Sequence, residues 1–190
     1  SVDEPTVSMT FQLNNSPFAG REVKFVTSRQ VRERLDRELI HNVALRVENT
    51  DDPDKLKVSG RGEFQLSILI ENMRREGYEL AISRPEVIIH ETEHGREEPY
   101  ETLVVDLGAD YQGSVMERLG ERRGELQNMQ LDGKGRVRLD YVIPARGLIG
   151  FQSEFRTLTA GTGLMFHVFD HYGPHHSGDI SRRNNGVLIS

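Results

Sequence analysis

The chain has 190 residues, of which 36% are hydrophobic and 28% charged, and its formal net charge is −6. This composition is typical of a globular protein and argues against a disordered chain, a membrane-spanning chain or a surface that binds nucleic acid everywhere. The absence of cysteine excludes disulfides, thiolate zinc sites and cysteine nucleophiles, and it fits a reducing cytosol. We therefore expect a cytoplasmic protein with no signal peptide and no membrane partner.

Four strands are predicted in the first half of the chain. Apolar and polar residues alternate from Val7 to Leu13, which predicts a strand with one buried face. Shorter runs of the same kind predict three further strands, at residues 43–47, 56–58 and 78–82. The Ser-Arg-Pro sequence at residues 83–85 marks the boundary of this half.

Two helices are predicted between these strands. Thr27 and Gln30 form a capping-box pattern that opens the first helix. Its buried face repeats every four residues, at Val31, Leu35 and Leu39. The second helix is predicted over about residues 62–76, and Gly77 ends it.

The same order of elements recurs in the second half. Strands are predicted at residues 103–107, 129–131, 137–143 and 164–168. Ser114 and Glu117 form a capping box that opens a helix ending at Gly124, and Asp132-Gly133 is a strong hairpin signal. Another helix face is indicated by apolar residues spaced i, i+3, i+7 and i+10, at Leu148, Phe151, Phe155 and Leu158.

The order β-α-β-β-α-β thus appears twice, which is the ferredoxin-like split βαβ order. We predict an α+β fold of two tandem ferredoxin-like sandwiches, each with a four-stranded antiparallel sheet and two helices on one face. The predicted domains span residues 1–83 and 84–172. The composition changes from His171 onward, and we interpret residues 173–190 as a short irregular tail that begins a truncated further domain.

Several motifs are better explained by structure than by chemistry. Gly133-Lys134-Gly135 lies in a predicted hairpin and lacks the Lys-Ser or Lys-Thr ending of a phosphate-binding loop. The Gly-x-x-Gly pattern at residues 147–150 opens an amphipathic helix, so helix packing explains it better than nucleic-acid binding. The predicted central strands carry basic or small residues at their exposed positions and no aromatic platform on which RNA bases could stack.

Two groups of titratable residues invite a catalytic or metal-binding interpretation. The first is a cluster of potential metal ligands near the end of the chain: His167, Asp170, His171, His175, His176 and Asp179. We expect His167 in a strand and the others in a loop, which favours a solvated or partner-contacting segment. The second is a set of carboxylates expected at a solvated sheet edge rather than in a catalytic pair: Glu91, Glu93, Glu97, Glu98 and Glu101.

Basic residues gather in one stretch of the second half. From Glu117 to Arg138 there are six basic and four acidic residues, so the local net charge is +2 in a chain of −6. Helix capping and solubility account for such cations as well as contact with a phosphate backbone does, and both interpretations stay open. The candidate phosphate contacts are Arg118, Arg122, Arg123, Lys134, Arg136, Arg146, Arg182 and Arg183.

Three stretches resemble a known family. Residues 60–66, Gly-Arg-Gly-Glu-Phe-Gln-Leu, resemble the Gly-x-Gly-Glu-Leu-His-Leu signature in domain III of translational GTPases related to elongation factor G. Residues 113–124, which end in Arg-Arg-Gly, resemble the first helix of that family's domain V. Residues 145–151 and 158–163 resemble the BipA/TypA branch in particular. Phe64 stands where leucine is usual and is expected in the core, whereas Gln65 stands where the family has histidine.

The resemblance covers about residues 2–172 and implies a ribosome-associated, GTP-binding translational GTPase that acts in large-subunit assembly, stress adaptation and virulence regulation. It implies that the G domain precedes this fragment, binds GTP and magnesium and hydrolyses GTP, so the chain itself is expected to hold no catalytic, cofactor or metal site. It also implies that domain III faces the small subunit and domain V the large-subunit rRNA near the stalk base. The eight cations above thereby become candidate rRNA contacts.

Two other classes of function have weaker support in the sequence. A regulatory pair of ferredoxin-like domains that binds a metal or a small molecule has the histidine-rich segment as its only support. A stand-alone enzyme is disfavoured because the sequence contains no nucleophile–base constellation. We expect a monomer whose partner is the ribosome, through rRNA and ribosomal proteins of both subunits, and neither DNA nor a membrane.

Overall fold

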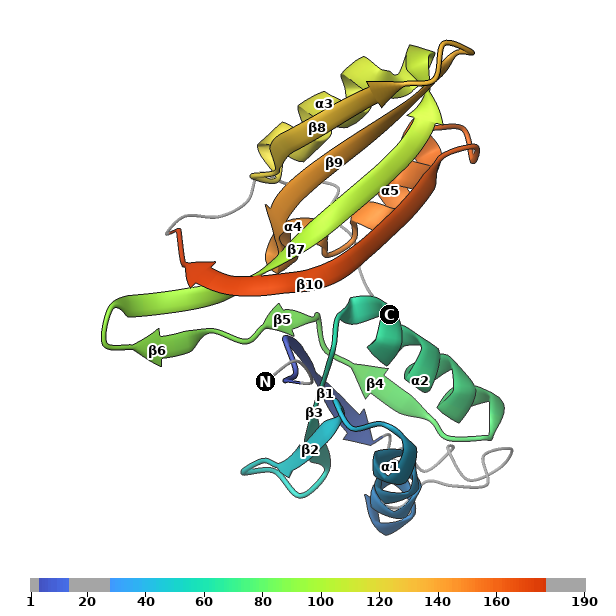
Figure 1. Ribbon diagram of the computed structural model, residues 1–190. Coiled ribbons are helices and arrows are strands. Elements are labelled where there is room, and N and C mark those ends of the chain that lie inside the picture. Colours follow the sequence, from blue (N-terminus) through green and yellow to red (C-terminus); the bar gives the residue numbers. More distant parts are fainter. Residues whose placement is uncertain (1–3, 14–27, 177–190) are drawn as a thin grey trace. The chain divides into compact units, whose positions relative to one another are not determined.

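The computed structural model describes residues 4–13 and 28–176, and it divides the chain into two compact units at Ile88 and Ile89 (Figure 1). Each unit contains its own antiparallel sheet and its own hydrophobic core. No helix in these two ranges is long and apolar enough to span a membrane.

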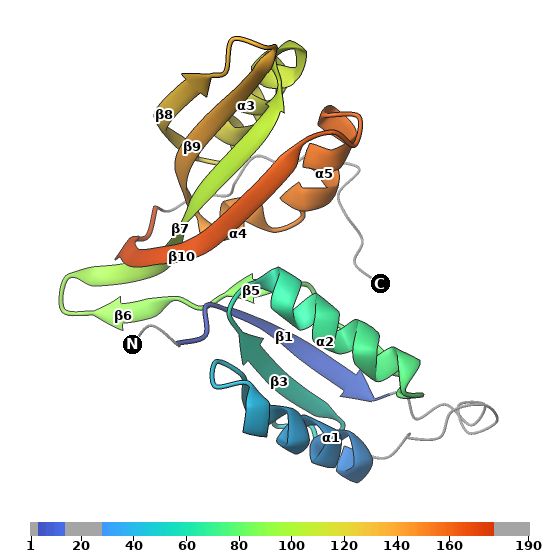
Figure 2. The same ribbon diagram turned by 45° about the vertical axis from the view of Figure 1, so that its right-hand side comes forward.

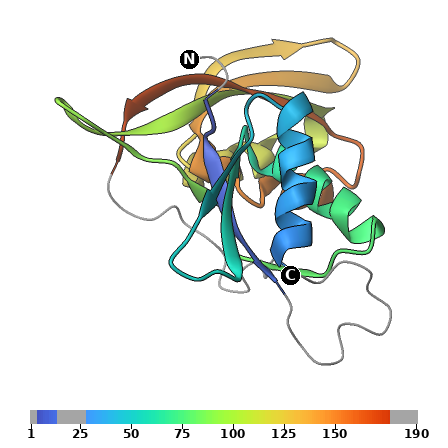
Figure 3. The same ribbon diagram turned by 90° about the horizontal axis from the view of Figure 1, so that it is seen from below.

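The first unit follows the order β-α-β-β-α-β, with one short strand added. Its elements are β1 (Val7–Leu13), α1 (Ser28–His41), β2 (Arg46–Asn49), β3 (Lys55–Gly60), α2 (Glu63–Arg75), β4 (Leu80–Ile82) and β5 (Glu86–Val87). The sheet order is β2-β3-β1-β4, and β5 also pairs with β1. This is the ferredoxin-like arrangement, and Figures 2 and 3 show α1 and α2 on one side of the sheet.

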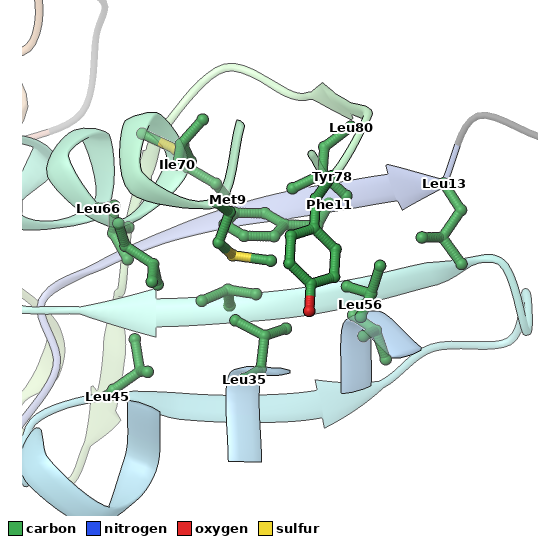
Figure 4. Close-up of a cluster of buried hydrophobic side chains, with 14 of the residues drawn as sticks. Met9, Phe11, Leu13, Leu35, Leu45, Leu56, Leu66, Ile70, Tyr78 and Leu80 are labelled. Atoms are coloured by element: carbon green, nitrogen blue, oxygen red, sulfur yellow. The ribbon is translucent and has the colours of Figure 1, made fainter. Parts of the chain in front are cut away.

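The core of the first unit forms where the predicted apolar faces meet. The alternating apolar residues of β1 are all buried, and Val31 and Leu35 of α1 pack on them together with Leu66 and Met73 of α2. Figure 4 shows Leu35 and Leu66 in this cluster. The strand period of two and the helix period of 3.6 therefore point to the same core.

Two positions in the first unit differ from expectation. The second strand begins at Arg46 rather than at Val43, which lies in a turn and is 78% exposed, because Ala44 and Leu45 take the buried positions. Phe64 is not in the core: it is 53% exposed, and Leu66, Leu69 and Ile70 bury the inner face of α2 instead. Gln65, by contrast, accepts a hydrogen bond from Arg61 N and donates one to Asn42 Oδ1.

Arg34 joins the two helices of the first unit. Its guanidinium donates to both carboxylate oxygens of Glu76, at 2.6 and 3.0 Å, and also to Glu38 one turn along α1. The hydrogen bond from Arg34 holds the pKa of Glu76 below its usual value.

The second unit repeats the order with longer strands. Its elements are β6 (His90–Thr92), β7 (Gly95–Gly108), the 3₁₀ turn η1 (Ala109–Tyr111), α3 (Gln112–Glu121), β8 (Glu125–Leu131), β9 (Arg136–Pro144), α4 (Ala145–Leu148), α5 (Phe151–Leu158) and β10 (Leu164–Pro174). The sheet order is β10-β7-β9-β8, with β6 paired to β7, and Figure 2 shows the helices on one face. The predicted fold class, two ferredoxin-like sandwiches, is confirmed.

Three expectations for the second unit are corrected. Helix α3 begins at Gln112, before the Ser114–Glu117 capping box, and no side chain caps it. The single helix expected from Leu148 is two helices, α4 and α5, because Gly150 adopts a left-handed conformation between them. The last strand continues through His171 to Pro174, since residues 97–100 of β7 extend far enough to pair with it.

Candidate nucleic-acid interface

Two exposed cations of the candidate set, Arg123 and Lys134, lie at the β8–β9 hairpin. Arg138 is not in that set; it is exposed as well, although its Nε is 3.0 Å from Asp140 Oδ1. β8 is an edge strand whose seven residues are all exposed. Arg123 precedes it, Lys134 lies in the turn that follows it, and Arg138 of β9 is opposite Gln130. At about 3.3 Å per residue, these cations lie along a line of roughly 20 Å. Such a row can contact several phosphates of a nucleic-acid backbone rather than a single phosphate.

Arg123 occupies a backbone position where glycine is usual. Helix α3 ends with Gly124 N donating to Leu119 O at 2.8 Å and Arg123 N donating to Gly120 O at 3.1 Å, which is a Schellman motif. Arg123 takes the left-handed position, with a φ of 66°. A non-glycine residue there costs about 1 kcal/mol. The exposed side chain of Arg123 is therefore a functional candidate on structural grounds as well.

The turn of the hairpin is fixed by Asp132. Its Oδ1 accepts hydrogen bonds from the backbone N–H groups of Lys134, at 2.7 Å, and Arg136, at 3.0 Å. These two donors, the Lys134 N–H first, lower the pKa of Asp132. Gly133 and Gly135 have φ values of 73° and 92°. The turn therefore accounts for this Gly-Lys-Gly sequence, as predicted.

Arg122, the neighbour of Arg123, points into the protein. Its guanidinium donates to the carbonyl oxygens of Gly147 at 2.7 Å and Ile149 at 3.0 Å, and it lies 5.2 Å from the centre of the Phe151 ring. Its side chain thus satisfies the carbonyls at the break between α4 and α5. This close packing also explains the Gly-x-x-Gly pattern, since a Cβ at Gly147 would collide with Arg122 O.

Arg118 lies next to Arg122 and shares a partner with it. Its Nη1 is 2.9 Å from Glu154 Oε2, and Arg122 Nε is 3.4 Å from the other oxygen of the same carboxylate. Both guanidinium groups are largely buried. Arg118 and Arg122 therefore use their charge to hold α3 against α5.

Arg136 and Arg146 also pair with acidic groups of the second unit. Arg136 bonds to Asp106 at 2.7 Å and remains partly exposed. Arg146 donates to Glu98 at 2.7 Å and to the carbonyl of His176 at 2.8 Å, while His176 N donates to Glu98. Arg182 and Arg183 lie outside the described residues.

The carboxylates expected at a solvated edge do not all lie there. Glu98 is fully buried against Arg146, and Glu101 is buried beside His167, with Glu101 Oε1 2.6 Å from His167 Nδ1. The expectation was wrong for these two residues because β10 pairs with β7 past both of them. β9 flanks Glu101 but ends opposite Tyr100, and Arg146 of α4 covers Glu98 instead. Glu91 and Glu97, toward the free end of the β6–β7 ribbon, are not fully buried.

The histidine cluster is spread along β10 and its continuation. His171 and Asp170, expected in a loop, lie in the strand, where the two side chains are 2.6 Å apart and the His171 ring stacks on Tyr100. Within residues 4–13 and 28–176, no three acidic, histidine or cysteine side chains gather as a metal site would require. Asp179 lies outside these ranges.

The open face of the second sheet carries an apolar edge, formed by alternate residues of the strand predicted at 164–168. Leu164, Phe166 and Val168 of β10 are exposed, Phe166 by 64%. The register places Phe166 opposite Val104, and the next strand, β9, presents Asp140 beside it. On this face the central strand β9 presents Arg138 and Asp140, whereas β7, also central, carries Tyr100, which stacks on His171. Aromatic side chains therefore lie on β7 as well as at the β10 edge.

Comparison with known proteins gives this architecture a family context. Residues 96–183, most of the second unit, match the family described as Elongation factor G C-terminus. The second unit is therefore a domain of the kind found at the C-terminus of a translational elongation factor.

Along all 190 residues the chain is 64% identical to proteins named Large ribosomal subunit assembly factor BipA from Salmonella typhimurium strain LT2 and Escherichia coli K12. It is 61% identical to the protein of that name from Haemophilus influenzae. The chain spans 31% of the length of these relatives. The recognition of the chain as BipA-like and related to elongation factor G is thus confirmed.

Proposed function

We propose that the chain is the ribosome-docking part of a BipA-type factor that acts in assembly of the large ribosomal subunit. The observation that carries this proposal is the 64% identity, over the whole chain, to relatives named for that process. In this proposal the protein is cytoplasmic and acts as a monomer. Binding and hydrolysis of GTP, with Mg²⁺, belong to the part of the relatives that the chain does not span.

The exposed cations of the β8–β9 hairpin are the proposed rRNA contacts. Arg123, Lys134 and Arg138 lie on the surface, and Arg123 occupies a backbone position that favours glycine. Arg118, Arg122 and Arg146 are proposed to support this surface indirectly, since their charges are paired inside the unit. Arg136 belongs to neither group, because it is paired with Asp106 but remains partly exposed. Arg182 and Arg183 stay in the proposed contact set.

The finer assignments are also proposals. Residues 1–83 would act as a domain III-like part facing the small subunit, residues 84–172 as a domain V-like part facing large-subunit rRNA, and residues 173–190 as the start of a further domain. The match of residues 96–183 to the elongation factor G C-terminus supports the second of these. Roles in stress adaptation and virulence regulation follow the same resemblance.

Cosedimentation with purified large subunits at rising salt tests this function. We expect binding to weaken steeply with salt, because each phosphate that the chain neutralises adds about 0.7 to 0.9 to the log–log slope. A triple variant, Arg123→Glu with Lys134→Glu and Arg138→Glu, should lose most of the binding and most of that slope.

The matched control makes the same three charge reversals on exposed residues of the first unit, at Arg29, Arg37 and Arg75. It should bind large subunits as the unaltered chain does. The proposed contact surface would be contradicted if the affinity for large subunits did not change with salt concentration, or if both triple variants bound equally well. Absence of any binding to large subunits would contradict the proposed function.

A further inference from the structure

A groove in the first unit lies between α2 and the edge of the sheet. Its volume is about 500 Å³, within the range of ordinary ligand-binding pockets. Its floor is apolar and is formed by Met9 of β1, Ile70 of α2 and Ile82 of β4. Figure 4 shows Met9 and Ile70 on the α2 side of the core cluster. The proposed ribosome-docking function makes no use of this groove.

The groove lies where the sheet is interrupted beside β1. β4 pairs with residues 11–13 of β1 and β5 pairs with residues 7–8. Between them, Ser83 leaves the regular ladder: its N–H donates to Thr10 O at 3.0 Å, and its hydroxyl accepts from Thr10 N at 2.8 Å. Pro85 follows and has no N–H with which to continue the ladder. The sheet is therefore narrow at this point.

The backbone of β4 presents hydrogen-bonding groups on its outer edge. β4 is the last strand in the sheet order. Because Ser83 N faces β1, the alternation of an antiparallel ladder turns the N–H and C=O groups of Leu80 and Ile82 away from β1. The carbonyl of Leu80 indeed accepts a hydrogen bond from Arg74 Nη2, at 3.2 Å, a side chain that also lines the groove.

The wall of the groove is one face of α2, and its charges have a direction. The charged lining residues are Glu63 at the start of the helix and Glu71, Arg74 and Arg75 near its end, so the cations are in excess only at that end. Thirteen helical residues span about 18 Å, which matches about five residues of an extended chain. Arg75 pairs with Glu71 on the surface, an ion pair of small net value that a ligand carboxylate could replace.

We propose that this groove binds an extended peptide segment of about five residues, which adds to the outer edge of β4. The Ile82 backbone pairs with the peptide backbone, and a peptide apolar side chain rests on Met9, Ile70 and Ile82. An acidic peptide residue lies over Arg74 and Arg75. An added strand obtains affinity from main-chain hydrogen bonds and specificity from alternate side chains, and the groove supplies both kinds of contact.

Selection of a phage-displayed library of random linear heptapeptides on the immobilised 190-residue chain tests the proposal. We expect enrichment of peptides with apolar residues at alternate positions and an acidic residue toward one end. Synthetic versions of the enriched peptides should bind at least tenfold more weakly to Ser67→Trp, in which an indole occupies the groove. Ser67 is an exposed groove-lining residue of α2, so this variant is expected to fold.

Ile68→Trp is the matched control. It adds the same side chain at the next position of α2, which is exposed but does not line the groove, and it should leave peptide binding unchanged. The proposal is overturned if no sequence is enriched, if the peptides bind Ser67→Trp as well as the unaltered chain, or if both variants lose binding. Self-association of the chain that only Ser67→Trp abolishes would assign the groove to a second copy and would also overturn it.

Discussion

Two neighbouring regions of the second unit use basic residues in opposite ways. In the corner where α3 meets α5, Arg118 and Arg122 are largely buried, and their charges are matched by Glu154 and by backbone carbonyls. In the β8–β9 hairpin, Arg123 and Lys134 are exposed. Arg122 and Arg123 are adjacent in sequence, yet only Arg123 is placed to reach a partner. A count of cations therefore overestimates the binding surface unless the internal partners are known.

The largest expected effect on stability comes from a buried ion pair of the second unit. Arg146→Met removes the charged partner of Glu98, which is fully buried and would keep only the hydrogen bond from His176 N. Breaking a buried pair in this way costs about 3–5 kcal/mol. We expect that loss in the free energy of unfolding, measured by urea denaturation at pH 7. The double variant Arg146→Met with Glu98→Leu removes both charges and should recover much of the stability; an equally unstable double variant would show that the charge is not the cause.

Arg122→Ala compares the two neighbours directly. It leaves the carbonyls of Gly147 and Ile149 without their donor and removes the contact with Phe151, for a loss of about 2–4 kcal/mol. Arg123→Ala should change stability by less than about 0.5 kcal/mol, as exposed substitutions do. Thermal and urea unfolding of both variants measure the difference. Similar losses of stability in the two variants would show that Arg122 and Arg123 do not differ in their structural role.

The sequence predicted the elements whose signals are local. The alternation of β1 and the Asp-Gly turn at residue 132 depend on a few neighbouring residues, and both were found as expected. The pairing of Arg146 with Glu98 joins residues 48 apart, and no local pattern reports it. The extension of β10 to Pro174 has no local signal for a similar reason, since it pairs with residues 97–100 of β7, which are far away in the sequence.

The candidate site was predicted only as a region. The sequence located the cations near the right hairpin, but the direction of each side chain depends on tertiary packing. The Schellman motif shows the difference: Arg-Arg-Gly indicates a helix end, yet the left-handed residue is Arg123 and not the glycine. The exposure of Phe64 has the same origin, because Leu66 and Met73 already fill the inner face of α2.

Arg123→Gly should separate stability from binding. Glycine adopts the left-handed conformation without the Cβ penalty, so the variant should be more stable by about 1 kcal/mol. If Arg123 contacts rRNA phosphate, the same change should weaken ribosome binding and reduce the salt slope by about 1. Urea unfolding and cosedimentation measure the two effects. A variant that gains stability and keeps its full affinity would remove Arg123 from the proposed contacts.

The smallest expected effect concerns the turn that orients Lys134. The backbone N–H groups of Lys134 and Arg136 lower the pKa of Asp132, so folding favours the ionised carboxylate. Its contribution to stability is therefore complete above the ordinary aspartate pKa of about 3.9, and it is lost as the pH falls through the lower value in the folded state. Asp132→Ala should be less stable than the unaltered chain at pH 7, and this difference should narrow below about pH 4.

Asp132→Asn is the control, since it keeps a side-chain oxygen that can accept from Lys134 N but does not titrate. Its difference from Asp132→Ala should stay nearly constant with pH, whereas the difference between the unaltered chain and Asp132→Ala should shrink in acid. Urea unfolding at several pH values between 3 and 7 measures both. If the unaltered chain and Asp132→Ala lose stability in parallel throughout, the carboxylate charge contributes nothing to the turn. The position of Lys134 would then depend on the glycines alone.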